Sequence, residues 1–144
     1  MNGLFCVAVH ALIYLDKRGC LLSSEELATN ICTNPARVRK VMAKLKKAGL
    51  VTTRTGTDGG YQLAADPAKV TLDMVADALE VRFVEPAWHS GVGVDCGCMV
   101  ASGMAGVMDH LFDDLDRRCR THLAGVCLTD LEAELESNQK GEPL

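Results

Sequence analysis

One stretch of the chain, residues 34–61 (NPARVRKVMAKLKKAGLVTTRTGTDGGY), constrains the fold more than any other. Asn34 is a favoured helix cap, and Pro35 suits the first helical position because its missing N–H would have no partner there. Two stripes recur at helical spacing: an apolar one at Val38, Val41, Met42 and Leu45, and a cationic one at Arg37, Lys40, Lys44 and Lys47. The spacing therefore predicts a basic amphipathic helix.

A β-hairpin is predicted directly after this helix. Gly49 supplies the left-handed residue that ends the helix. Residues 51–55 are typical of a strand, residues 56–60 of a turn and residues 61–63 of a returning strand. A short basic helix followed by a hairpin is the outline of a winged helix-turn-helix, whose helix suits the major groove of DNA and whose hairpin reaches the backbone or a minor groove.

The residues before this stretch complete the helix-turn-helix order. Apolar residues between positions 4 and 17 predict a first helix that is buried on more than one side. Ser23 and Glu26 have the spacing of a capping box, which opens a short second helix. Cys32 and Thr33 then form the tight turn before the basic helix.

The second half of the chain predicts three further helices. Thr71 caps one that ends near Glu80, and residues 81–95 lack periodicity and are predicted to form a loop. The next runs from Met99 to about residue 123. Its apolar stripe consists of Val100, Met104, Val107, Met108, Leu111, Leu115 and Cys119. A stripe of this length needs a partner, and a second copy of the same helix is the economical one. A capping box at residues 129–132 predicts a short last helix to about residue 136, followed by a frayed tail.

The charge of the chain is divided between its two halves. The formal net charge is −4, but residues 1–64 hold nine basic and four acidic residues, whereas residues 65–144 hold six basic and fifteen acidic ones. A basic half beside an acidic half favours binding to a polyanion through one surface. The DNA-binding candidates are Asn34, Arg37, Arg39, Lys40 and Lys44 on the helix, and Arg54, Gly59 and Gly60 on the wing.

Three further classes of protein, namely membrane-spanning proteins, secreted proteins and enzymes, are disfavoured. No run of about 18 apolar residues is present, so a membrane span is not expected. The apolar N-terminus has no positively charged start and no small-residue cleavage site, and seven cysteines without a secretory signal indicate a reducing compartment, so a cytoplasmic protein is expected. No catalytic triad, carboxylate pair or phosphate loop stands out, so an enzyme is not predicted.

The combined motifs AVHALIYL, SSEELA, NPARVRKVMAKLKKAGLV, GTDGGYQLA and VTLDMVADALE resemble the IscR/NsrR/CymR family of bacterial regulators, the Rrf-two family. The match covers residues 1–80 well and the later helices more loosely. The resemblance implies a homodimeric repressor or activator that binds a palindromic DNA operator. The expected fold is mainly α with a small β-hairpin: a winged helix-turn-helix at residues 1–80, a linker or sensor loop at 81–98, and a dimerisation helix with a C-terminal helix at 99–144.

Three kinds of signal are open for such a regulator. The first is a thiol switch, in which oxidation joins Cys98 of one subunit to Cys32 of the other, with Cys96 as the alternative partner. The second is a metal or iron–sulfur site built from Cys96, Cys98, Cys119 and His122, although iron–sulfur members carry three cysteines in a loop that here has two, and no cofactor is favoured. The third is a small molecule or partner protein, with the cysteines as core filler. A winged helix that binds another protein is the rival to DNA binding, and it predicts no salt-sensitive DNA affinity.

Overall fold

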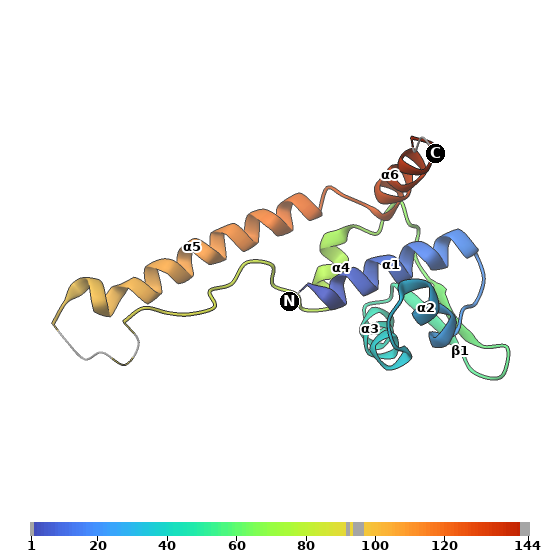
Figure 1. The fold of residues 1–144 in the computed structure, drawn as a ribbon, viewed down its shortest axis with the longest axis horizontal. Coiled ribbons are helices and arrows are strands. Elements are labelled where there is room, and N and C mark those ends of the chain that lie inside the picture. Colours follow the sequence, from blue (N-terminus) through green and yellow to red (C-terminus); the bar gives the residue numbers. More distant parts are fainter. Residues whose placement is uncertain (1, 92, 94–96, 142–144) are drawn as a thin grey trace.

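The computed structural model describes residues 2–91, 93 and 97–141. A small module of helices with a β-hairpin at its edge forms one end of the molecule, and one long helix extends away from it as an arm (Figure 1). The elements are α1 (Gly3–Arg18), α2 (Ser24–Ile31), α3 (Pro35–Lys47), β1 (Val51–Arg54), β2 (Gly60–Leu63), α4 (Leu72–Ala78), α5 (Met99–Leu123) and α6 (Leu128–Lys140). This mainly helical winged helix-turn-helix confirms the predicted fold class.

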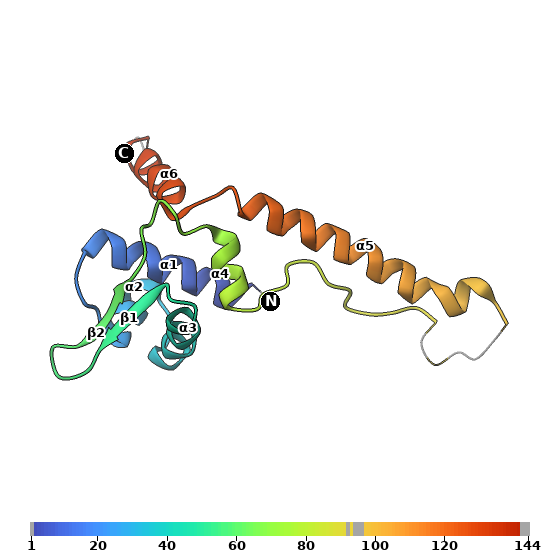
Figure 2. The ribbon, with the colours of Figure 1, turned by 180° about the vertical axis from the view of Figure 1, so that it is seen from behind.

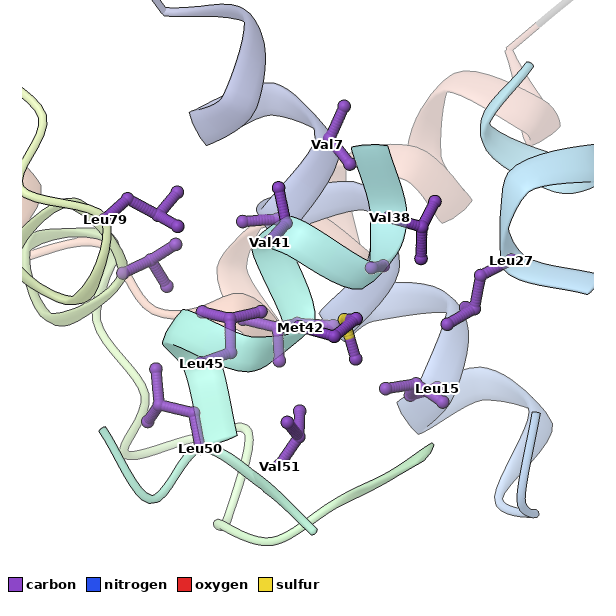
Figure 3. Close-up of a cluster of buried hydrophobic side chains, with 14 of the residues drawn as sticks. Val7, Leu15, Leu27, Val38, Val41, Met42, Leu45, Leu50, Val51 and Leu79 are labelled. Carbon is purple, nitrogen blue, oxygen red and sulfur yellow. The ribbon is translucent and has the colours of Figure 1, made fainter. Parts of the chain in front are cut away.

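The core of the module lies between α1 and α3. The apolar stripe predicted for α3, Val38, Val41, Met42 and Leu45, is completely inaccessible to solvent. These side chains pack against α1, α2, α4 and the start of β1, as Figure 3 shows. Leu128, the first residue of α6, is also fully buried in this core. The last helix therefore packs on the same module as the first.

The helix starts follow the predicted capping residues. Ser23 accepts a hydrogen bond from the Glu26 N–H at 3.1 Å and its own N–H donates to the Glu26 carboxylate at 2.8 Å, which completes the capping box. Asn34 Oδ1 accepts from the Arg37 N–H at 2.8 Å, and Thr71 Oγ1 accepts from the Met74 N–H at 3.2 Å. Each bond satisfies a backbone donor that the first helical turn leaves unpaired.

The wing is a two-stranded antiparallel hairpin that is fastened to the module. Its strands pair from Val51 opposite Leu63 to Arg54 opposite Gly60. Leu22, in the connection between α1 and α2, exchanges two backbone hydrogen bonds with Tyr61, at 3.0 and 2.8 Å. Gly60 has φ +155°, and a Cβ there would lie 2.5 Å from the Leu22 carbonyl oxygen. Only glycine lets the wing approach the module this closely.

The last helix differs from its prediction. It begins at Leu128 rather than after a cap at Thr129, and it continues to Lys140, so the expected frayed tail from Ser137 is wrong. The capping box is formed two residues earlier, where the Asp130 carboxylate accepts from the Cys127 N–H at 2.9 Å. A tertiary contact fixes this start, because the Leu128 N–H donates to the Val70 carbonyl at 3.0 Å.

Candidate nucleic-acid interface

The cationic face of α3 is open to solvent on the side of the helix that faces away from the core. Arg37, Lys40 and Lys47 are exposed, and Lys44 is half-buried. The four residues follow one another at helical spacing, so their charges line one edge of the helix. A helix of this kind presents basic side chains to a major groove when the helix axis lies along it.

The two arginines of α3 differ in their surroundings. The guanidinium of Arg37 lies beside Gly3, where a side chain on the first residue of α1 would collide with it. Arg39 donates to the Ser24 hydroxyl at 3.1 Å and pairs with the Glu25 carboxylate at 3.5 Å, both on α2. The structure thus leaves Arg37 on the open basic face and ties Arg39 to α2.

The three wing candidates lie together at the end of the hairpin. Arg54 is the last residue of β1 and pairs with Gly60, the first residue of β2. Gly59 packs so tightly against the Arg54 carbonyl that a Cβ would clash with it. Asn34, by contrast, uses its side-chain oxygen to cap α3, so only its amide nitrogen is free of that role.

The opposite end of the basic face meets α4. Lys44 and Lys47 of α3 line a cleft of about 290 Å³ together with Asp77 and Glu80 from the C-terminal end of α4. Asp77 pairs in turn with Arg120 of α5 at 3.3 Å, and Arg120 also forms an ion pair with Asp73. Asp77 of α4 therefore lies beside the basic face of α3 and also pairs with the long helix α5.

The arm has two different faces. Its apolar side chains Val100, Met104, Val107, Leu111 and Leu115 are between 36% and 62% exposed, and within the described chain α5 has no fully buried residue. Asp109, Asp113 and Asp116 lie on the other side, because residues two apart on an α-helix point about 200° apart. The described residues of the chain therefore cover this apolar face only in part.

The acidic face of α5 holds the linker that precedes it. Asp113 pairs with Arg82, Asp116 accepts from the N–H groups of Phe83 and Val84 at 2.7 and 3.0 Å, and Asp109 contacts His89 Nε2 at 2.7 Å. The linker consequently runs outward from the module along α5, as both ribbon views show (Figure 1 and Figure 2). In the sequence, the only sign of this contact is the helical spacing of the three carboxylates, which are four and three residues apart. The sequence does not show which groups they bind.

The cysteines of the sensor hypothesis occupy separate places. Cys98 is the N-terminal cap residue of α5, and it is exposed. The backbone N–H groups of Ala101 and Val100 lower the pKa of its thiol, since they favour the thiolate. Cys32 is also exposed, and it ends α2 in a left-handed conformation with φ 64°. Cys96 lies outside the described residues.

The described metal candidates, Cys98, Cys119 and His122, do not converge within one chain. Cys98 begins α5, whereas Cys119 and His122 lie in its last two turns, about 30 Å away at 1.5 Å per residue. Among the described residues, no group of three His, Cys, Asp or Glu side chains is arranged to hold a metal ion. None of the described helices is long and apolar enough to cross a membrane.

Comparison with known proteins identifies the architecture. The model of the Rrf2 family, described as iron-dependent transcriptional regulator, matches residues 2–134. This chain belongs to the Rrf2 family. The HTH-type transcriptional regulator YwnA of Bacillus subtilis is 32% identical over 133 residues, which cover 91% of this chain and 96% of YwnA. The HTH-type regulator IscR of Aliivibrio salmonicida is 29% identical over 104 residues, which cover 71% of this chain and 57% of IscR.

Solved structures show the same fold. A transcriptional regulator from Lactobacillus plantarum superposes with a TM-score of 0.82 at 29% identity, over 99% of this chain and 100% of that one. CymR of B. subtilis, the global cysteine regulator, superposes with a TM-score of 0.65 at 20% identity, over 93% of this chain and 96% of CymR. The protein is thus a bacterial DNA-binding transcriptional regulator of the Rrf2 family. The family consists of regulators, which confirms that the chain is not an enzyme.

The iron named in the family description does not fit the residues that the structure describes. An iron or iron–sulfur site needs several thiolate or imidazole ligands around one point. Among the described residues, Cys98 supplies a thiol at the start of α5. The residues that follow it in the helix, Met99 and Val100, supply neither a thiolate nor an imidazole. The described residues do not supply such a set, so iron has no part in the mechanism that follows.

Proposed function

We propose that this Rrf2-family regulator acts as a homodimer that binds a palindromic DNA operator through α3 and the wing, and that thiol oxidation at Cys98 changes this binding. The main observation that supports the proposed DNA contact is the solvent-exposed basic face of α3. Arg37, Lys40 and Lys47 are exposed there, with Lys44 half-buried beside them. Wing residue Arg54 extends the same charge to the hairpin.

The arm supports the dimer. A 25-residue helix whose apolar side chains stay open to water is unfavourable alone, because each buried Val, Leu or Met side chain is worth about 1.5–3 kcal/mol. A second copy related by a two-fold axis presents the same stripe and covers it. The two recognition helices of such a dimer read two half-sites of inverted sequence.

The thiol hypothesis is supported by exposure and by the environment of Cys98. A thiol at the start of a helix is more readily ionised, and the thiolate is the form that oxidants attack. In the proposed switch, the two thiols of Cys98 from one subunit and Cys32 from the other lose two protons and two electrons to an oxidant such as a disulfide or peroxide. One S–S bond forms, and it changes the separation of the recognition helices.

The DNA contact is tested by two variants with different expected effects. Arg37→Ala should lower discrimination against altered operator bases, at about 1–3 kcal/mol for a base contact, because guanidinium pairs bidentately with guanine. Lys44→Ala should weaken binding to all sequences and reduce the slope of log affinity against log salt by about 1. Binding is measured by fluorescence anisotropy on a duplex that the native protein selects from random DNA.

Arg117→Ala provides the matched control, because Arg117 is an exposed base on α5 that pairs only with Asp114 of the same helix among the described residues. It should leave affinity and salt slope unchanged. If Arg37→Ala and Lys44→Ala both behaved like this control, the basic face of α3 would not be the DNA surface. If the native protein bound no duplex in a salt-dependent way, protein–protein binding by the winged helix would replace the proposal.

A further inference from the structure

The joint between the arm and the DNA-binding module contains a charge cluster that the proposed DNA contact does not explain. Arg120, in the last turns of α5, pairs through Nε with the Asp73 carboxylate and also donates to the Asp73 carbonyl at 3.4 Å. The terminal nitrogen that donates to the Asp73 carbonyl, Nη2, also reaches the Asp77 carboxylate at 3.3 Å. Both carboxylates belong to α4, so one guanidinium spans two successive turns of that helix.

The Arg120–Asp73 pair is the part of the cluster that is least exposed to solvent. The side chains of Arg120 and Asp73 are 27% and 31% exposed, whereas Asp77 is 83% exposed. A half-buried ion pair is screened less than a surface pair, and the planar guanidinium fixes direction as well as distance. Arg120 therefore holds α5 at a defined angle to α4.

A second attachment nearby turns this contact into an angular constraint. The chain just after α5 is fixed to the module by backbone hydrogen bonds, from Leu72 N–H to the Val126 carbonyl at 2.8 Å and from Leu128 N–H to the Val70 carbonyl. Arg120 lies six residues before Val126, in the last turn of α5, which ends at Leu123. A fixed point just after α5 and a second contact within its last turn together determine where the arm points.

The α4 helix passes this orientation to the recognition helix. Leu79, at the end of α4, packs in the core with Val41 and Leu45 of α3 (Figure 3). Asp77 lines the same cleft as Lys44. Rotation of the arm about its attachment would consequently move α3 or break these contacts.

We propose that Arg120 is a positioning residue that fixes the direction of the α5 arm relative to α3, through Asp73 and Asp77, and thereby sets the separation of the two recognition helices in the dimer. This inference rests on the proposed homodimer. It predicts that Arg120 determines which half-site spacing the regulator accepts, although Arg120 touches no base. Loss of the guanidinium frees the arm to adopt several angles.

The test is a spacing series. Duplexes carry the selected operator with its native half-site spacing, or with one base pair added or removed between half-sites, which moves a half-site by about 3.4 Å and rotates it by about 34°. The native protein should lose about tenfold in affinity at both altered spacings, within the usual range of coupling between sites. Arg120→Gln should bind the three duplexes within about threefold of one another.

Four further variants separate positioning from a general structural role. Arg117→Gln, on the exposed side of the same helix, should keep the native optimum. Asp73→Asn should flatten it, and the double variant with Arg120→Gln should behave like Arg120→Gln alone, because the loss of Arg120 already removes the Asp73 contact. Arg120→Lys should restore part of the optimum, since one ammonium reaches Asp73 but lacks the fork that also reaches Asp77.

Sedimentation equilibrium and circular dichroism confirm that each variant is a folded dimer. A dimeric Arg120→Gln protein with an optimum as sharp as that of Arg117→Gln would overturn the inference and leave the DNA-binding dimer intact. If Arg120→Gln did not fold, Asp73→Asn would decide in the same way. A native protein that binds DNA as a monomer would overturn both the inference and the proposed dimer.

Discussion

Replacing Glu132 by glutamine should stabilise the protein at alkaline pH and have little effect at acidic pH. Glu132 lies on the face of α6 that packs on α1, between Leu128 and Leu131 on one side and Leu135 on the other. It is only 8% exposed, and its Oε1 has no hydrogen-bond partner among the described residues. A carboxyl in this position is costly to ionise.

Burial, and secondarily the neighbouring carboxylate of Asp16, raises the pKa of Glu132 from 4.5 to about 7, while the ammonium of Lys17 opposes the shift and Glu136 adds to it. Between pH 4.5 and pH 7 the folded protein therefore holds a proton that the unfolded chain has lost. Stability falls as pH rises through this window, because the folded state binds more protons. The full loss above pH 7 is about 3 kcal/mol, at about 1.4 kcal/mol for each tenfold change in the equilibrium.

Glutamine has the same shape and no proton to lose. Urea denaturation of native and Glu132→Gln proteins, at one protein concentration, should give equal midpoints near pH 4, below the unfolded pKa, and a higher midpoint for the variant at pH 8.5. A difference of about 3 kcal/mol corresponds to about 6–12 °C in Tm for a chain of this size. Glu134→Gln, on the exposed side of α6, should follow the native protein at every pH. Parallel pH profiles for Glu132→Gln and the native protein would refute the reasoning.

Three other perturbations follow from the structure. Leu111→Glu places a charge in the centre of the exposed stripe, so sedimentation equilibrium should show a monomer, whereas His110→Glu on an adjacent face should stay dimeric. Gly60→Ala should destabilise the fold by about 1–3 kcal/mol in urea, and by more than Gly56→Ala, because both glycines have positive φ but only the Gly60 methyl would meet the Leu22 backbone. Cys98→Ser should abolish any change in operator affinity on mild oxidation; a retained response would remove the thiol hypothesis.

The helix-turn-helix and wing were predictable because short-range interactions specify them. Ser23 and Asn34 cap the helices that follow them, and the required partners are backbone groups three residues away. Residues 34–61 have apolar and turn-forming residues at the spacings that an amphipathic helix and a hairpin require. The last helix was misplaced because Leu128 and Val70, which fix its start, are far apart in the sequence.

The candidate DNA surface was predicted as a set of charges, and its arrangement was decided by packing. The sequence placed Arg37 and Arg39 together as contacts, but α2 supplies Ser24 and Glu25 to Arg39 and leaves Arg37 on the open face. The sequence predicted the acidic residues of the second half only as a charge that contrasts with the basic half. Asp113 and Asp116 instead bind the linker.

The sequence by itself determined the elements of this protein, since capping residues, glycine turns and apolar periodicity act over a few positions along the chain. Only the tertiary structure decided which charges meet. Arg120 and Asp73 are 47 positions apart, and Glu132 is buried because α6 returns to pack on α1. The pairing of an arginine or the pKa of a carboxyl depends on the groups that surround it in space. Those groups are brought together by the packing of helices that are distant in the sequence.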